Sequence, residues 1–179
     1  MLHMLGAEGG STLCPRIAIV ALVLAVTAVP GQAFGKSAKT IPAGELVLAG
    51  TPVRCGAART VVTGLGEVAM TYPGYILLDP TLFSMPPAIQ HFWYAHECAH
   101  QLFGYGELAA DCWAIQTGKR LGWFGIGDLE WLEANAIRMR SDAEHPQAAV
   151  RLANLENCYA AAPDARPAKR VVVAFASGF

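Results

Sequence analysis

The segment His96-Glu97-Cys98-Ala99-His100 constrains this chain more than any other feature of its sequence. It lies in a stretch, residues 88–103, that contains neither glycine nor proline and is bounded by Pro86-Pro87 and Gly104. Proline is common in the first turn of a helix and glycine just after its end, so this stretch is predicted to be helical. Side chains four residues apart share one face of a helix, which brings the two histidines together.

Two imidazoles one helical turn apart can bind one Zn²⁺ ion at about 2.0–2.1 Å, and the spacing His-Glu-x-x-His is a known zinc-binding pattern. Glu97 is predicted to take a proton from zinc-bound water and so to act as general base. His91, roughly 140° around the helix from His96, is expected to be exposed. The plainer interpretation is a helix that carries two surface histidines and an ordinary glutamate.

Zinc needs a third protein ligand, and two acidic residues follow the glycine break at Gly104-Tyr105-Gly106. A second helix is predicted over residues 107–121. The break lets the chain reverse, so that Glu107 at the start of this helix is the predicted third ligand. Asp111 lies one turn further on the same face, where it could accept the N–H of a ligand histidine and orient the ring. The spacing also allows the two carboxylates to exchange these roles.

A further element lies near the end of the chain, where His145-Pro146 begins a helix predicted over residues 146–160. His145 is a candidate donor to the oxyanion of a tetrahedral intermediate. Arg151 could hold Asp111 or another site carboxylate in a bidentate pair. A His-Pro pair is also an ordinary helix boundary, which is the alternative interpretation.

Taken in order, the motifs HExxH, ExxAD and His-Pro-x-x-x-x-Arg-Leu resemble the gluzincin-type zinc peptidases that include the membrane-bound heat-shock protease and the CAAX prenyl protease. The resemblance spans about residues 75–155. It implies three zinc ligands, which are His96, His100 and Glu107. It also implies three catalytic residues, which are the general base Glu97 and the transition-state groups His145 and Arg151. The chain departs from the family in its short gap of six residues between the second histidine and the third ligand, and in lacking a series of transmembrane segments.

Short apolar runs precede the metal-binding helix, with turn residues such as Gly50-Thr51-Pro52 between them. They indicate a small sheet of three or four strands, near residues 45–49, 60–63, 67–71 and 75–78. In zinc peptidases the strand before the active helix typically forms the edge to which a peptide substrate adds, and here that strand would be Tyr75 to Leu78. A third helix is predicted over residues 128–140 with Asp128 as its N-cap. The predicted fold is a zincin-like single α+β domain, with a small N-terminal sheet followed by about four helices.

The beginning of the chain, residues 1–33, is predicted to be a signal peptide, because Arg16 precedes an apolar run that small residues follow. The run is shorter than the roughly 20 apolar residues of a transmembrane helix. The zinc metallopeptidase domain is predicted over residues 34–162, and the sequence does not place the C-terminal tail, residues 163–179. The protein is therefore expected to be exported, periplasmic or secreted, and membrane-anchored only if the signal is not cleaved.

Four cysteines follow the predicted signal peptide, namely Cys55, Cys98, Cys112 and Cys158. An even number in an exported chain suggests two disulfides, with three possible connectivities. A cysteine zinc site is the competing interpretation, but no Cys-x-x-Cys pair is present. Cys98 is two residues from each histidine and so points away from the metal, which argues against a bond to Cys112. The favoured pairing is Cys55 with Cys98 and Cys112 with Cys158.

The formal net charge is −1, without a long basic or acidic block, so nucleic acid is not an expected partner. The expected partner is a polypeptide substrate, and no stable membrane span is expected after signal cleavage. The expected function is zinc-dependent hydrolysis of peptide bonds by a metalloprotease. The alternative is a catalytically inactive exported binding or chaperone module, stabilised by zinc or stapled by disulfides.

Overall fold

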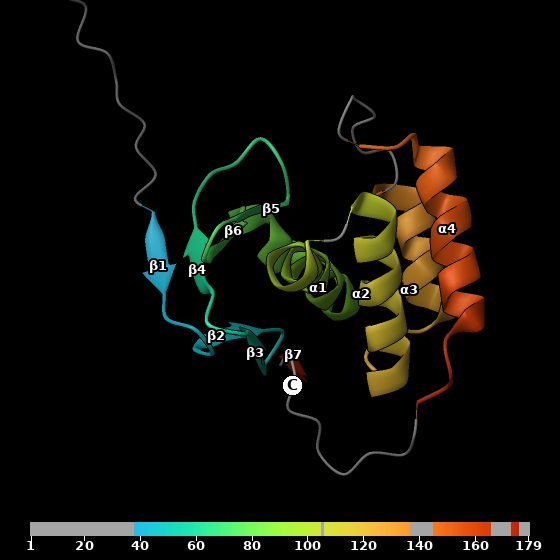
Figure 1. Ribbon diagram of the computed structural model, residues 1–179, viewed down its shortest axis with the longest axis horizontal. Coiled ribbons are helices and arrows are strands. Elements are labelled where there is room, and N and C mark those ends of the chain that lie inside the picture. Colours follow the sequence, from blue (N-terminus) through green and yellow to red (C-terminus); the bar gives the residue numbers. More distant parts are fainter. Residues whose placement is uncertain (1–37, 105, 137–144, 166–172, 176–179) are drawn as a thin grey trace, which may run out of the picture. The chain divides into compact units, whose positions relative to one another are not determined.

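Helix α1 (Pro87–Phe103), which carries the His-Glu-x-x-His segment, lies between the strands and the remaining helices (Figure 1). The computed structural model describes residues 38–104, 106–136, 145–165 and 173–175. Contacts divide the chain into Met1–Phe34 and Gly35–Phe179, and all described residues belong to the second unit. The predicted signal peptide lies outside the described residues.

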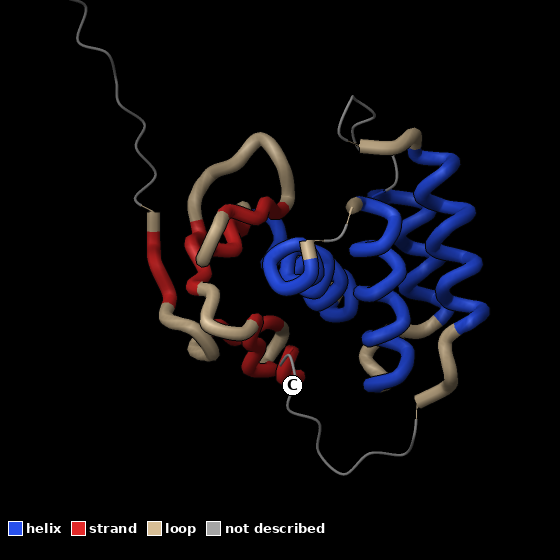
Figure 2. Tube along the Cα trace, viewed as in Figure 1, coloured by secondary structure: helices blue, strands red, loops and turns tan. Residues whose placement is uncertain are grey.

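A four-stranded sheet with the order β1-β4-β6-β5 contacts α1 on one side (Figure 2). Its strands are β1 (Lys39–Ile41), β4 (Arg59–Val62), β5 (Ala69–Tyr72) and β6 (Tyr75–Leu78). The β4–β6 pair is parallel, whereas β1–β4 and β5–β6 are antiparallel. The connection between β4 and β5 therefore carries the chain to the edge of the sheet, and the β5–β6 hairpin returns it to the middle.

This order corrects the expected position of the substrate-binding edge. The strand before α1, β6, is paired on both sides: its Leu77 is opposite Val61 of β4 and Met70 of β5. Among the described strands, β5 pairs with β6 alone, so β5 is one of the two edge strands of this sheet, and β1 is the other. The prediction was wrong because it took the strand nearest to the helix in sequence, whereas the hairpin inserts that strand between two others.

A second sheet has the order β2-β3-β7, with β2 (Leu46–Leu48), β3 (Thr51–Cys55) and β7 (Val173–Phe175). Ala49 and Gly50 join β2 to β3 with φ angles of 46° and 81°, as a two-residue hairpin turn of the I′ type requires. The sequence interpretation placed a turn at Gly50-Thr51-Pro52, but strand β3 already begins at Thr51. The proline is accommodated because β7 pairs only with Val53–Cys55, so no bond to β7 is needed at Pro52. Part of the unplaced tail thus forms β7, parallel to β3.

Helix α1 is buried throughout residues 88–99, because strands cover one side and helix α2 (Glu107–Leu121) covers the other. The expected exposure of His91 is wrong for this reason, since the helix has no free face there. The His91 side chain is 4% exposed and its ring lies 5.5 Å from that of Trp123. Its Nδ1 is 2.7 Å from the Pro87 carbonyl oxygen.

The remaining helices are α3 (Ile126–Trp131), which continues into a π-helical turn (Leu132–Ala136), and α4 (Ala148–Ala161). The prediction that Asp128 is the N-cap of α3 is wrong. Asp128 lies in the first turn of α3 and accepts a hydrogen bond from Gly125 N at 2.8 Å. The predicted continuation of this helix beyond residue 136 lies outside the described residues. Helix α4 packs along α2, and the whole confirms the predicted α+β class.

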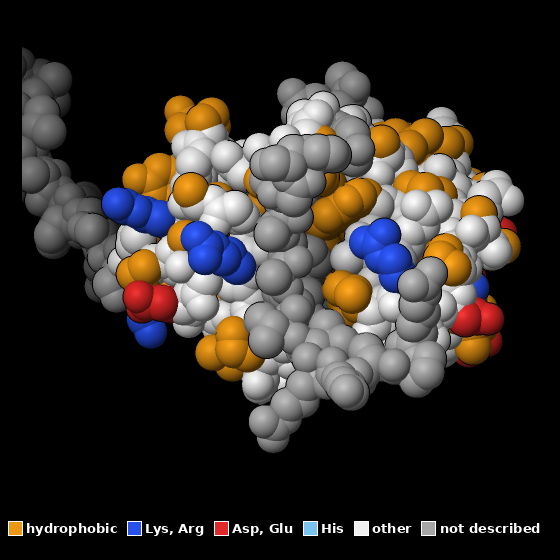
Figure 3. Space-filling model, turned by 60° about the horizontal axis from the view of Figure 1, so that its bottom comes forward, with side chains coloured by type: hydrophobic (Ala, Val, Ile, Leu, Met, Phe, Trp, Pro, Cys, Tyr) orange, Lys and Arg blue, Asp and Glu red, His pale blue; other side chains and the backbone are white. Residues whose placement is uncertain are grey.

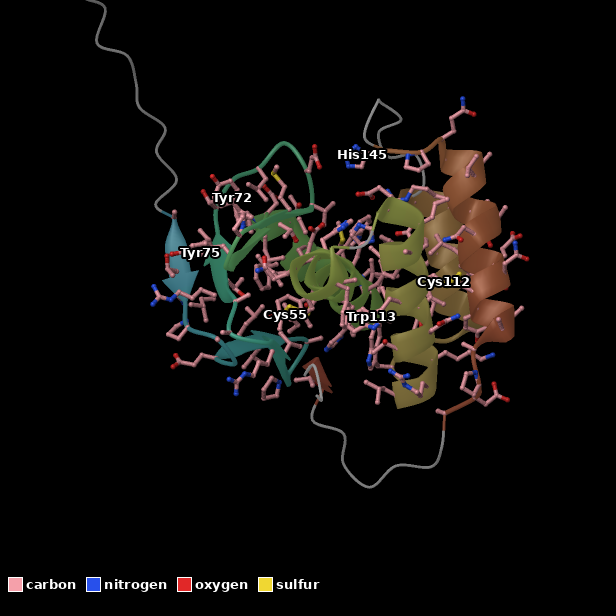
Figure 4. All side chains as sticks on the ribbon, viewed as in Figure 1. Cys55, Tyr72, Tyr75, Cys112, Trp113 and His145 are labelled. Carbon is pink, nitrogen blue, oxygen red and sulfur yellow. A yellow bond between two sulfur atoms is a disulfide. The ribbon has the colours of Figure 1, made fainter. Side chains whose placement is uncertain are left out.

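Two disulfides connect these elements, and they confirm the favoured pairing. Cys55–Cys98 joins β3 to α1, with the Cα atoms 5.6 Å apart. Cys112–Cys158 joins α2 to α4, with the Cα atoms 5.2 Å apart. Cys112 lies on the side of α2 that faces α4 (Figure 4). None of the described helices is long and apolar enough to span a membrane.

Candidate metal centre

The two histidines of α1 face each other across one helical turn. Their Nε2 atoms are 3.0 Å apart, and His96 is almost fully buried whereas His100 is partly exposed. Two unprotonated imidazole nitrogens at this distance repel each other, so either a proton or a cation between them stabilises the pair.

Glu107 completes a cluster of three ligand atoms. Helix α1 ends at Gly104, whose φ of 63° is the left-handed conformation that glycine adopts at helix C-termini. Glu107 is the first residue of α2. Its Oε2 lies 3.4 Å from His96 Nε2 and its Oε1 lies 3.3 Å from His100 Nε2. The three ligand atoms are all within 4.8 Å of one another, so His96, His100 and Glu107 could hold a metal ion.

The spacing of these atoms fits a small divalent cation. Ligand atoms about 2.0–2.1 Å from a tetrahedral Zn²⁺ ion lie about 3.3 Å from one another. The two imidazole nitrogens are 3.0 Å apart, and each lies 3.3 or 3.4 Å from a different oxygen of Glu107, so the nearest donor atoms of the three residues are close to that spacing. Two imidazoles and one carboxylate are also a donor set that zinc accepts, with room for a fourth ligand.

Asp111 lies behind the cluster, on the other side of the His96 ring. Its Oδ1 is 2.9 Å from His96 Nδ1, although the ring N–H is not aligned well enough for a straight hydrogen bond. A carboxylate at Nδ1 favours the tautomer with the proton on Nδ1, which leaves the Nε2 lone pair for a metal. Of the two carboxylates that the sequence left open, Glu107 therefore lies at the Nε2 atoms and Asp111 lies in the orienting position.

Arg151 of α4 binds Asp111 through two parallel hydrogen bonds. Its Nε donates to Asp111 Oδ2 at 2.8 Å and its Nη2 donates to Asp111 Oδ1 at 2.6 Å. The remaining Nη1 lies 3.7 Å from Glu107 Oε2. Arg151 thus forms a bidentate pair with Asp111, one of the carboxylates that the sequence offered, and also lies close to Glu107.

These groups maintain one another's charge. Burial alone would raise the pKa of Glu107, but contacts with His100, His96 and Arg151 hold it well below its usual range. Burial would also raise the pKa of Asp111, yet the close contact with His96 and the hydrogen bonds from Arg151 lower it. Burial opposes the charged form of His96, but Asp111 and Glu107 outweigh burial and raise the pKa of His96 to about 9. Both carboxylates stay ionised, and a bound cation would displace the proton of His96.

Glu97, the predicted general base, is 6% exposed, and its carboxylate contacts Thr71 of strand β5. Thr71 Oγ1 is 2.8 Å from Glu97 Oε2 and also 2.8 Å from the Glu97 backbone oxygen. A hydroxyl group carries one proton, so it donates to one of these oxygens at a time.

The cluster opens on a cleft of about 860 Å³. Residues 65–71, which run from the β4–β5 connection onto β5, form one wall. Asp79 fixes this connection, because its carboxylate accepts hydrogen bonds from Leu65 N at 2.7 Å and from Thr81 N at 2.9 Å. His145 lies on the opposite side, near the N-terminal end of α2 (Figure 4).

Six of the predicted site residues line this one cleft: His96, Glu97, His100, Glu107, His145 and Arg151. The seventh, Asp111, is fully buried behind them. Sequence reasoning missed Thr71, which belongs to no motif and reaches Glu97 only through the packing of β5 on α1. Tyr105, in the glycine turn, lies outside the described residues.

Comparisons of the chain with protein-family models, with curated proteins and with solved structures found no match.

Proposed function

We propose that the protein is a zinc-dependent metallopeptidase that hydrolyses peptide bonds in a polypeptide substrate. One observation carries this proposal: three convergent ligand atoms and a separate, buried glutamate line the same open cleft. A purely structural metal site would need the ligands but would have no use for a positioned carboxylate beside them.

The proposed ligands are His96, His100 and Glu107, with Asp111 and Arg151 orienting them. Zinc is proposed over other divalent cations because two imidazoles and one carboxylate match its preferred donors. When bound, the cation lowers the pKa of water and polarises a carbonyl group.

The protein's own residues then perform the remaining tasks. Glu97 accepts the proton of the attacking water, and His145 donates a hydrogen bond to the oxygen that becomes negative in the tetrahedral intermediate. Arg151 acts through Asp111 and Glu107, to which its guanidinium is bound. The substrate would lie along the edge of β5, where an extended peptide can add as a further strand.

Other features agree with a peptidase outside the reducing cytosol. Two disulfides are typical of proteins in an oxidising compartment, which supports export to the periplasm or the cell exterior. The motif resemblance to heat-shock and prenyl-processing zinc peptidases supports the same function.

The surface charge does not favour nucleic acid as a partner. On the face drawn in Figure 3, the described Lys and Arg side chains form separate spots, whereas nucleic-acid binding uses a continuous basic surface.

Metal content of the purified protein tests the site, with His100→Ala and Glu107→Ala beside the wild type. We expect about one zinc ion per wild-type chain and loss of zinc from both variants. Glu133→Ala is the matched control, because this glutamate is exposed and belongs neither to the ligand cluster nor to the lining of the cleft. Wild-type protein that takes up no zinc would overturn the proposal, and retention of zinc by Glu107→Ala would exclude Glu107 as a ligand.

Turnover tests the chemistry, with fluorescein-labelled casein as an unfolded protein substrate. Glu97→Gln should keep its zinc and lose activity by about 10²- to 10⁴-fold, because the general base is removed while the ligands stay. Cleavage by Glu97→Gln at the wild-type rate would contradict the mechanism.

A second candidate function is an inactive binding or chaperone module. The observation that favours it is that the cluster includes residues of both α1 and α2. A bound metal would therefore link these two helices, as the disulfides link β3 to α1 and α2 to α4. This alternative predicts that zinc raises the unfolding temperature of the wild type and of Glu97→Gln equally, and that neither cuts casein.

A further inference from the structure

The general base of the proposed reaction is held by a residue outside every recognised motif. Thr71 lies on the edge strand β5, where Ala69 and Thr71 face the molecule's interior while Met70 and Tyr72 are exposed. From this position the Thr71 hydroxyl contacts both Glu97 Oε2 and the Glu97 backbone oxygen, each at 2.8 Å, and it donates its one proton to either of them.

This contact makes the two carboxylate oxygens of Glu97 different from each other. Oε2 is engaged by Thr71, whereas Oε1 has no hydrogen-bond partner among the residues that the structure describes. A glutamate side chain has three rotatable bonds, so a contact at one oxygen restricts where the other can point. When Oε2 accepts the Thr71 proton, Oε1 is the oxygen that remains to accept a proton in the cleft.

Strand β5 is itself fastened to α1 close to Thr71. The Gln101 side chain lies 3.0 Å from both Tyr72 O and Gly74 N, with its amide nitrogen toward the former and its amide oxygen toward the latter. The hairpin turn is therefore tied to the helix one residue after His100. Thr71 is the residue before Tyr72, which Gln101 contacts, so the position of the Thr71 hydroxyl relative to Glu97 is restricted.

We propose that Thr71 is a positioning residue for Glu97, which fixes Oε2 so that Oε1 faces the attacking water. This inference rests on the proposed function, since it assigns a role within that reaction. It also couples the two halves of the site: the strand along which the substrate would lie is the strand that holds the base.

The test compares Thr71→Val, which keeps the shape and removes the hydroxyl, with Thr71→Ser, which keeps the hydroxyl. On a quenched peptide taken from a casein site that the protein cuts, Thr71→Val should lower kcat by about 10- to 100-fold. KM should stay within about twofold, and Thr71→Ser should restore kcat to within about threefold of wild type, because only orientation of the base is changed. Thr40→Val, at the opposite edge of the same sheet, is the matched control and should behave as wild type.

A second readout does not require turnover. In crystal structures of zinc-loaded proteins, the Glu97 carboxylate should keep its place in Thr71→Ser and should move or spread over several conformers in Thr71→Val. An unmoved carboxylate in Thr71→Val, or an unchanged kcat, overturns the role of Thr71 and leaves the proposed function intact. A wild-type protein that binds zinc without cutting any peptide overturns the proposed function, and the crystal structures then still decide whether Thr71 positions Glu97.

Discussion

Arg151 and Asp111 form a fork-shaped ion pair in which both hydrogen bonds are short and both residues are buried. The pair joins α4 to α2 on the far side of the His96 ring from the ligand cluster. A buried pair of this kind matters most when it is broken, because the partner that remains is an unpaired charge inside the protein.

The first prediction concerns this pair. Arg151→Met should lower the free energy of unfolding by about 3–5 kcal/mol, because Asp111 is left buried without its donor. The measurement is urea unfolding of the chelator-treated protein, followed by tryptophan fluorescence. The double variant Asp111→Asn/Arg151→Met should recover part of the loss, since no charge then remains unpaired. If the double variant lost as much free energy of unfolding as Arg151→Met, or more, the loss would come from packing rather than from the unpaired charge of Asp111.

The second prediction concerns acid stability and His91. Burial lowers the pKa of His91 in the folded protein, so the unfolded chain binds a proton at this residue more readily. Below about pH 6.5 the unfolded state gains that proton first, and stability falls as pH falls, by at most about 1.4 kcal/mol per pH unit from this residue. His91→Phe should make the loss of unfolding free energy between pH 7 and pH 5 smaller. An unchanged slope would exclude His91 as a source of acid sensitivity.

The third prediction concerns the disulfides. They close separate loops, with sequence separations of 43 and 46, so their contributions should add. Loop-closure entropy gives about 4 kcal/mol for each. Cys55→Ala/Cys98→Ala and Cys112→Ala/Cys158→Ala should each lose about that amount in urea unfolding. Because a domain is typically stable by about 5–15 kcal/mol, reduction of both bonds should unfold much of the protein, as circular dichroism would show. A fully reduced protein with an unchanged spectrum would contradict this.

The fourth prediction concerns Gly118 in α2. A Cβ atom at this position would lie 2.5 Å from Phe124 Cβ and 2.7 Å from the Trp123 ring. Gly118→Ala should therefore destabilise the protein by about 1–3 kcal/mol. Gly127→Ala is the control, because a Cβ atom on this glycine of α3 would meet nothing within 4 Å and alanine favours helix. If both substitutions lowered the thermal midpoint equally, the close approach at Gly118 would not be the cause of the destabilisation.

Local signals predicted much of the fold. Helix α2 and strand β6 have the predicted bounds, because glycine and proline mark where each begins or ends. Helical spacing directs Cys98 away from the histidines and so argued against a bond to Cys112, but it did not choose between Cys55 and Cys158; the structure shows the favoured partner, Cys55. The spacing of His96, His100 and Glu107 likewise predicted a cluster that the helical hairpin brings together.

Features that depend on distant segments were not predictable. The order of strands in a sheet is set by which surfaces pack, so nothing in residues 75–78 revealed that β6 would be internal and β5 the edge. His91 is buried because strands and helices cover α1 from both sides, which helical periodicity alone cannot show. Thr71 reaches Glu97 across 26 positions of sequence, by a contact that only the packed sheet creates.

The three proposed ligands all lie within residues 96–107, on two helices joined by one short turn. Closing so small a chelate costs little chain entropy, and local contacts of this kind form early in folding. The helical hairpin can therefore capture a cation before the rest of the chain has assembled. Thr71 comes from the sheet, whose strands pair across longer stretches of sequence, so the proposed metal site can form while the proposed base is still unaligned. Under the proposed function, this order of assembly would delay peptide cleavage until folding is nearly complete.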